Sequence, residues 1–158
     1  MSRTARVVIA STRAAAGTYQ DRCGPIIGDW LTARGFTVPT AAVVADGEPV
    51  AQALRSALGD GVDVVITSGG TGISPTDTTP QATEAVLDYQ IPGLAEAIRR
   101  SGLPRVPTAV LSRGVCGVAG DTLVINLPGS TGGVRDGLAV LGEVLDHALD
   151  QLAGGDHG

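Results

Sequence analysis

The feature that most constrains the fold is an apolar run that ends in a glycine-rich turn, at residues 62–72. The run is too short for a helix and rich in β-branched residues, so we expect a buried strand. The turn carries Gly69, Gly70 and Gly72, which allow backbone angles that a Cβ would forbid, and its successive amides can point at one anion. Asp77 follows five residues after the last of these glycines. The stretch therefore predicts an anion site with a carboxylate beside it; a tight turn without a ligand is the alternative.

Strand and helix signals alternate along the chain, which predicts the α/β fold class. We expect a three-layer sandwich with a mostly parallel central sheet flanked by helices, and a small β-hairpin in the turn-rich residues 114–121. One domain over residues 1–153 and a flexible tail over residues 154–158 are expected. The expected strands are residues 6–10, 37–44, 62–68, 108–112 and 122–127, and the expected helices are residues 25–34, 48–58, 80–87, 92–101 and 134–152.

The loops that follow parallel strands lie at one edge of the sheet, and ligands bind there in folds of this kind. Residues 45–47, 68–77 and 128–133 should meet at that edge, so Asp46 and Asp77 could face one pocket. Two carboxylates beside a polyphosphate repel it unless a divalent cation bridges them, and oxygen ligands suit Mg²⁺. The alternative is that Asp77 caps a helix or a turn and that Asp46 is a turn residue.

A second glycine-rich turn, residues 126–133, precedes the last expected helix. Backbone amides at the start of a helix bind phosphate well, so this turn is another candidate anion site. The alternative is an ordinary helix start capped by Ser130 or Thr131. A Gly-x-Ser-x-Gly nucleophile elbow around Ser130 is excluded, because Pro128 stands at the first glycine position.

Composition excludes several kinds of protein. The 158 residues include no lysine, and all eleven basic residues are arginine. A P-loop with its lysine and a lysine Schiff base, as in pyridoxal-phosphate enzymes, are therefore excluded. The net charge of −5 argues against a nucleic-acid coat, and no apolar run approaches the ~18 residues of a membrane span. The chain shows no signal-peptide pattern, and its two cysteines, Cys23 and Cys116, are isolated, so we expect buried thiols in a reducing cytoplasm. We expect neither nucleic acid nor membrane as a partner.

Four stretches carry a resemblance that spans nearly the whole chain in order. They are residues 11–13 with 17–22, Ala45-Asp46, the run from Thr67 through the glycine turn to Asp77-Thr-Thr-Pro80, and Leu111-Ser-Arg-Gly with Ile125-Asn-Leu-Pro-Gly-Ser130. In these stretches the chain resembles the Mog and MoaB family of molybdenum-cofactor biosynthesis proteins. The glycine turn with an aspartate and Thr-Pro at fixed offsets, together with Asn-Leu-Pro-Gly, makes the resemblance specific.

The resemblance implies molybdopterin adenylyltransferase activity, in which ATP with Mg²⁺ and molybdopterin react, pyrophosphate is released, and the adenylylated product awaits molybdenum insertion. The family's catalytic and metal-binding aspartates fall on Asp46 and Asp77. Many Mog-type members have aspartate where Thr12 stands. Nucleotide and phosphate contacts fall on Gly69, Gly70, Thr71, Gly72 and Ser74, and molybdopterin contacts fall on Ser11, Arg13, Ser112, Asn126, Pro128, Gly129 and Ser130.

The resemblance also implies a homotrimer, paired into a hexamer in some members, and a partner protein for molybdenum insertion. Two other functions stay open at this stage. One is a non-catalytic, trimeric molybdopterin carrier or scaffold of the MoaB type, and the other is a small nucleotide-binding enzyme outside this pathway. Release of pyrophosphate from ATP in the presence of molybdopterin separates the enzyme from the carrier.

Overall fold

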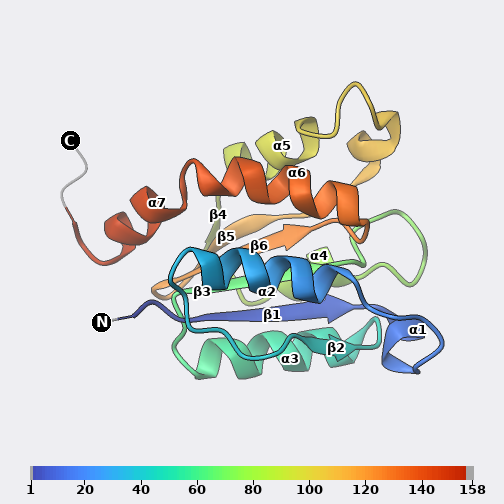
Figure 1. Ribbon diagram of the computed structural model, residues 1–158, viewed down its shortest axis with the longest axis horizontal. Coiled ribbons are helices and arrows are strands. Elements are labelled where there is room, and N and C mark those ends of the chain that lie inside the picture. The colour runs from blue at the N-terminus through green and yellow to red at the C-terminus, as the bar shows by residue number, and fades with distance from the viewer. Residues whose placement is uncertain (1, 156–158) are drawn as a thin grey trace.

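The computed structural model describes residues 2–155 and has a six-stranded sheet as its middle layer, with the strand order β2-β1-β3-β6-β5-β4 (Figure 1). The neighbours β2, β1, β3 and β6 run parallel, whereas β5 and β4 are each antiparallel to the strand beside them. The predicted α/β sandwich with a mostly parallel sheet is thus confirmed. The strands are β1 (Ala5–Ala10), β2 (Ala42–Val44), β3 (Val64–Ser68), β4 (Tyr89–Gln90), β5 (Cys116–Ala119) and β6 (Thr122–Leu127).

Helices cover both faces of this sheet unequally. One core joins the sheet to α2, α5, α6 and α7, and a smaller core joins the other face to α3 and α4. The strands alternate between the two cores: Val64 and Ile66 of β3 face the larger core and Val65 faces the smaller one, as the two-residue period of a strand requires. The helices are α1 (Thr12–Ala15), α2 (Cys23–Ala33), α3 (Glu48–Gly59), α4 (Thr79–Glu84), α5 (Pro92–Arg100), α6 (Thr131–Gly142) and α7 (Leu145–Leu152).

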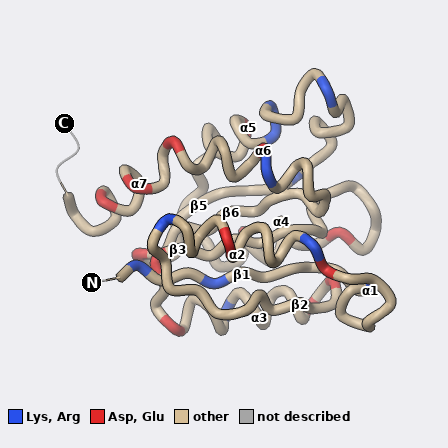
Figure 2. Tube along the Cα trace, viewed as in Figure 1, with Lys and Arg blue, Asp and Glu red and all other residues tan. Residues whose placement is uncertain are grey.

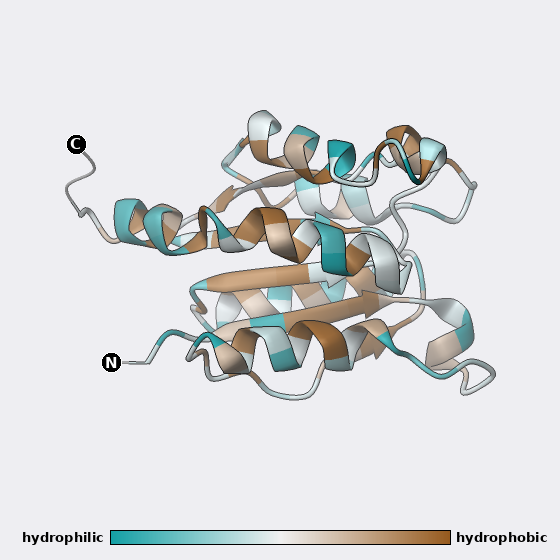
Figure 3. Ribbon diagram, turned by 45° about the horizontal axis from the view of Figure 1, so that its top comes forward, coloured by the Kyte–Doolittle hydropathy of each residue, from teal (hydrophilic) through white to brown (hydrophobic). Residues whose placement is uncertain are grey.

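The hydropathy of the ribbon follows these layers (Figure 3). The central strands are apolar along most of their length, and the helices show apolar residues on one side and polar residues on the other. Basic and acidic residues are interspersed along the chain (Figure 2), and several form surface ion pairs, such as Arg3 with Asp146 and Asp150. Among the described residues, none of the helices is long and apolar enough to cross a membrane.

The prediction of a strand at residues 108–112 is wrong. The segment is instead a 3-10 helix, η1 (Pro107–Leu111), in which Val110 and Leu111 are 58% and 48% exposed. Pro107 lies in its first turn, where the ring fixes a helical φ angle and no amide hydrogen is needed. The place beside β6 is taken by β5, which pairs with β6 as an antiparallel hairpin. Only the first arm and the turn of this hairpin fall within the predicted residues 114–121, and its second arm is β6.

Other elements also differ from their predicted bounds, most clearly the second strand and the final helix. The strand expected at residues 37–44 is reduced to β2 (Ala42–Val44), because Pro39 lacks the amide hydrogen that a ladder needs. The long final helix is divided into α6 and α7 at Glu143 and Val144, next to Gly142, a poor helix former. The edge strand β4 (Tyr89–Gln90) was not predicted. Of the predicted tail, residues 156–158 lie outside the described residues.

Candidate functional site

The loops that follow β1, β3 and β6 meet at Gly69. Its φ of +95° is unfavourable for any residue with a side chain, and a Cβ at this position would collide with the carbonyl oxygen of Ala10 at the end of β1. On the other side, a Cβ at Gly129, in the loop after β6, would lie 3.4 Å from the Cα of Gly69. The glycine turn is therefore in contact with the loops after β1 and β6, and of the predicted convergence it meets the loop at residues 128–133 here.

Asp46 reaches the glycine turn from the loop after β2. Its Oδ2 accepts a hydrogen bond of 3.0 Å from the hydroxyl of Thr12, and its own backbone N–H donates to the same hydroxyl at 3.1 Å. A Cβ built on Gly70 would lie 3.1 Å from Asp46 Oδ1. Thr12 thus orients Asp46 so that its other carboxylate oxygen faces the turn.

Asp77 reaches the same turn from its C-terminal side. Its Oδ2 accepts a hydrogen bond from the backbone N–H of Ser74 at 3.1 Å, and a Cβ on Gly72 would lie 2.8 Å from that oxygen. Asp77 is not the N-cap of α4, because Thr78 holds that position. The two aspartates predicted to face one pocket therefore lie against the same turn, Asp46 at Gly70 and Asp77 at Gly72.

Arg113 fixes the conformation of the turn through three hydrogen bonds. Its Nε donates to the carbonyl of Gly72 at 2.9 Å, its Nη2 donates to the carbonyl of Asp77 at 2.7 Å, and its backbone N–H donates to the carbonyl of Thr71 at 2.7 Å. Arg99 supports this segment in turn by donating to the carbonyl of Ser112 at 2.8 Å. The sequence reasoning gave neither arginine a role. The partners of the Arg113 side chain are 36 and 41 positions away, so no local pattern indicates these bonds.

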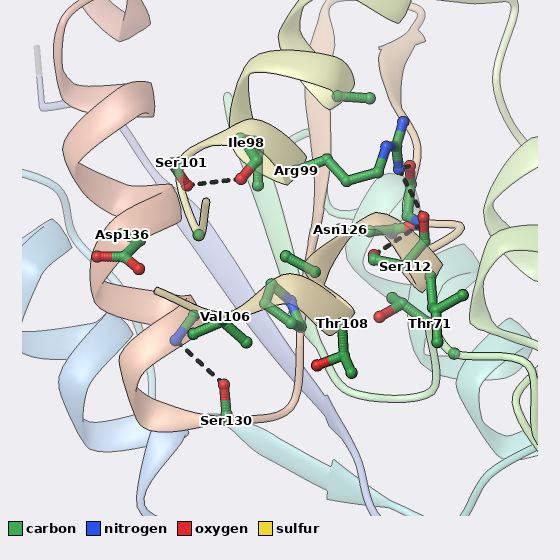
Figure 4. A pocket seen from close by; sticks show the side chains of 18 residues that line it. Thr71, Ile98, Arg99, Ser101, Val106, Thr108, Ser112, Asn126, Ser130 and Asp136 are labelled. Atoms are coloured by element: carbon green, nitrogen blue, oxygen red, sulfur yellow. Dashed lines mark hydrogen bonds between the residues drawn. The ribbon is translucent and has the colours of Figure 1, made fainter. Parts of the chain in front are cut away.

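A cavity of about 240 Å³ lies next to the turn, and Thr71 and Gly72 line it whereas Asp46 and Asp77 do not. Thr71, Ser112 and Asn126 lie together at one side of it and Asp136 lies at the other (Figure 4). Its remaining wall comes from α5 and from residues 101–111, which the sequence reasoning did not assign to a site. Six predicted site residues line this cavity, namely Thr71, Gly72, Ser112, Asn126, Pro128 and Ser130.

Ser130 and Asn126, two polar residues of the cavity wall, already form hydrogen bonds within the protein. Ser130 is the N-cap of α6 and accepts a hydrogen bond from Gly133 N–H at 3.1 Å, as the capping alternative predicted. Asn126 is 3% exposed, and its side-chain amide donates to the hydroxyls of Thr67 and Thr83 at 2.9 and 3.0 Å. The Asn126 Oδ1 accepts from Val115 N–H at 3.1 Å. With both amide hydrogens used, Asn126 shapes this wall and has none left for a ligand.

Other predicted contacts lie away from the cavity. Ser11 caps α1 and accepts a hydrogen bond from Ala14 N–H, and the guanidinium of Arg13 lies 5.5 Å from the ring centre of Tyr19. Both follow β1, next to Thr12, and therefore belong to the Asp46 side of the turn. Ser74 is exposed beside Asp77, and its hydroxyl lies 3.4 Å from that of Thr76. The structure thus divides the predicted molybdopterin contacts between two places.

The two cysteines are buried, as predicted, and are not suited to nucleophilic chemistry. Burial raises the pKa of Cys116 to about 12, and burial also raises the pKa of Cys23, whose thiol donates to the carbonyl of Gly129. Since the thiolate is the reactive form, both side chains stay unreactive near neutral pH. Among residues 2–155, no group of three or more His, Cys, Asp or Glu could hold a metal ion by itself.

Comparison with known proteins supplies the family. A family profile described as a probable molybdopterin binding domain matches residues 6–147. The chain is 39% identical over 155 residues to a molybdenum cofactor biosynthesis bifunctional protein of Synechococcus elongatus, which covers 98% of this chain and 49% of that protein. It is also 39% identical over 137 residues to a molybdopterin adenylyltransferase of Haemophilus influenzae, which covers 84% of this chain and 69% of that protein.

Among solved structures, the Mog molybdopterin biosynthesis protein of Mycobacterium ulcerans superposes with a TM-score of 0.92 at 67% identity, covering 95% of this chain and 99% of the other. The chain spans about half the length of the bifunctional relatives that it matches. The match over residues 6–147 and the level of identity agree with the motifs around the glycine turn. The chain therefore belongs to the Mog and MoaB family of molybdopterin-binding domains.

Proposed function

We propose that this protein acts in molybdenum cofactor biosynthesis by transferring AMP from ATP to the terminal phosphate of molybdopterin. A phosphate oxygen of molybdopterin forms a bond to the α-phosphorus of ATP, the bond from that phosphorus to the bridging oxygen breaks, and pyrophosphate leaves. The observation that carries this proposal is that Asp46 and Asp77 lie against one glycine turn, while Thr71 and Gly72 of the same turn line the cavity that contains four of the predicted molybdopterin contacts.

The cavity suits a flat ring with polar edges. Ile98, Val106 and Leu111 contribute apolar surface, while Thr71 and Ser112 contribute hydroxyls. Pockets that enclose whole drug-sized ligands measure roughly 300–1,000 Å³, so a cavity of about 240 Å³ holds a ring system and leaves the rest of the ligand outside. The phosphates of a ring bound here would extend over the glycine turn toward the two aspartates.

The aspartate side fits a bound Mg²⁺. One carboxylate oxygen of Asp46 has no hydrogen bond among the described residues, and the turn next to it lacks the Cβ atoms that would fill the space. Mg²⁺ in nucleotide sites is commonly held by one or two carboxylates together with substrate phosphates, so a complete protein cage is not needed. When bound, this ion would neutralise phosphate charge and orient the leaving pyrophosphate.

The protein's own part in such a reaction is orientation and charge stabilisation. Backbone amides of the glycine turn would hold phosphate oxygens, and Arg113 keeps the carbonyls of Gly72 and Asp77 in place. A phosphate nucleophile is already ionised near neutral pH, so little general-base assistance is needed. The adjacent sites for ring and phosphates would hold the two substrates in line.

The other properties implied by the family are proposed with this function. We propose a homotrimer located in the cytoplasm that passes its product to a molybdenum-insertion protein. Exposed apolar side chains along residues 103–111 support self-association, since Leu103, Val106, Val110 and Leu111 are 37–58% exposed. Sedimentation of the purified protein should give three times the monomer mass, and a monomer at micromolar concentration would contradict the trimer.

The function itself is tested by mixing the protein with molybdopterin, Mg²⁺ and ATP and measuring pyrophosphate. We expect release that requires all three components. Tight molybdopterin binding without pyrophosphate release would instead select the carrier, and a lack of affinity for molybdopterin would move this protein outside the pathway.

A further inference from the structure

One buried hydroxyl next to the glycine turn has no partner. Thr79, the first residue of α4, is 1% exposed, and among residues 2–155 its Oγ1 is the one buried side-chain nitrogen or oxygen without a hydrogen bond. The great majority of buried polar side-chain atoms in proteins are paired, because an unpaired one destabilises the folded state. An exception in a candidate active site points to a partner that the free protein does not provide.

The same helix shows how such a hydroxyl is normally paired. Thr83, one turn later, is also buried, and its Oγ1 donates to the carbonyl of Thr79 at 2.8 Å and accepts from the amide of Asn126. A threonine inside a helix finds the carbonyl four residues before it, whereas Thr79 begins α4 and has no preceding turn. Its position at the helix start therefore removes the usual acceptor.

The unpaired hydroxyl of Thr79 and the carboxylate of Asp46 border the same space beside Gly70. A Cβ on Gly70 would collide with Thr79 Oγ1 and would lie 3.1 Å from Asp46 Oδ1, so both oxygens border the space that this glycine leaves empty. The N–H of Thr79 donates to the carbonyl of Gly70 at 3.1 Å, which fixes the start of α4 against the turn. Asp46 uses its other oxygen, Oδ2, for Thr12, and its Oδ1 has no hydrogen bond among the described residues.

We propose that Thr79 is a positioning residue for Asp46: its hydroxyl donates to Asp46 Oδ1 when that carboxylate turns to hold the Mg²⁺ of a bound nucleotide. This inference rests on the proposed function and extends it. Because Gly70 has no Cβ, the space that both oxygens border stays open to this movement of the carboxylate. Among the described residues the hydroxyl has no partner, and its burial therefore costs local stability that the bond formed on ligand binding would offset.

Three variants test this. Thr79→Val keeps the shape and removes the hydroxyl, Thr79→Ser keeps the hydroxyl, and Thr83→Val is the matched control on the same helix. Without ligand, Thr79→Val should raise Tm by about 2–4 °C, while Thr83→Val should lower it because the Asn126 network loses a member. A lower Tm for Thr79→Val would show that its hydroxyl is already paired and would overturn the proposal.

The ligand measurement uses calorimetric titration with Mg²⁺ and a non-hydrolysable ATP analogue. Thr79→Val should bind this complex about 10-fold more weakly, and Thr79→Ser should bind it like the wild type. In an Asp46→Asn background the effect of Thr79→Val should disappear, since the two side chains act as one unit. Equal affinity in Thr79→Val and wild type, or an undiminished effect in the Asp46→Asn background, would overturn the proposal.

The outcomes distinguish this inference from the proposed function. If the wild type binds the Mg²⁺ complex but releases no pyrophosphate with molybdopterin, adenylyl transfer fails and the coupling of Thr79 to Asp46 is still measured. If the wild type releases pyrophosphate and Thr79→Val matches it in nucleotide affinity and kcat, the inference fails alone.

Discussion

The two sides of the glycine turn differ in how their polar atoms are paired. On the cavity side, Asn126 is buried with all of its amide hydrogens bonded to Thr67 and Thr83. On the aspartate side, Thr79 Oγ1 and Asp46 Oδ1 have no hydrogen bond among the described residues. A satisfied network keeps a wall rigid, whereas unpaired oxygens are available to a ligand. The difference supports the proposal that the cavity receives the ring of molybdopterin and that the aspartates hold the charged phosphates and metal ion.

The strongest way to break this comparison is to remove charge on the aspartate side. Asp77→Asn and Asp46→Asn should each lower kcat about 10²–10³-fold with Tm nearly unchanged, because they remove charge stabilisation and no core packing. Steady-state pyrophosphate release and thermal melts measure both. Asp29→Asn, at an exposed position on α2, is the control and should leave turnover unchanged. Near wild-type turnover in both aspartate variants would refute their catalytic roles.

The converse test is made on the cavity side. Asn126→Ala should reduce the free energy of unfolding by about 2–4 kcal/mol, because it removes the hydrogen bonds that Asn126 makes to the buried Val115 N–H and to the hydroxyls of Thr67 and Thr83. Urea unfolding measures the change, and Gln90→Ala on the exposed edge strand β4 is the control. If Asn126→Ala instead kept full stability and lost molybdopterin affinity, Asn126 would be a ligand contact and the two sides would not differ as described.

Arg113 joins the two sides, so its loss should affect both. Arg113→Met should lower kcat/KM about 10–100-fold, because the carbonyls of Gly72 and Asp77 lose charged hydrogen bonds. Arg100→Met, which removes an exposed ion pair with Glu96, should change kcat/KM less than 2-fold. An Arg113→Met enzyme with unchanged KM for both substrates and unchanged kcat would show that the turn holds its shape without the arginine.

The smallest expected effect is a pH dependence from the buried framework of the cavity side. The pKa of Cys116 is raised from its ordinary value of 9.0 to about 12 by burial, so the folded protein keeps a proton that the unfolded chain releases above pH 9. The contribution of this buried thiol to the free energy of unfolding is fully present below pH 9. It is lost as the pH rises toward 12, and in that range the free energy of unfolding falls by about 1.4 kcal/mol per pH unit. Stability should fall less steeply in Cys116→Val than in wild type between pH 9 and 10.5, and parallel curves would contradict the burial effect.

Much of this arrangement was predictable from sequence, and particular residues show why. The turn at residues 69–72 follows a β-branched run, and parallel strands bring Asp46 and the turn to the same edge whatever the details of packing. Residues 108–112 were misassigned because Thr108 and Val110 favour strands. In the structure Pro107 begins a 3-10 helix there, and the strand that pairs with β6 is β5. The hydrogen bonds of Arg113 span about forty positions and have no local signature.

The sequence by itself determined the fold class, the glycine turn between two neighbouring loops and the acidic residues beside it, since these follow from local periodicity and from the handedness of strand connections. The tertiary structure alone decided which polar atoms are paired. Thr79 and Thr83 are the same residue type four positions apart on one helix. Asn126, which is distant in sequence, donates to the hydroxyl of Thr83, whereas the hydroxyl of Thr79 has no partner among the described residues. Hydrogen bonding depends on where separate segments meet, and no local pattern records that.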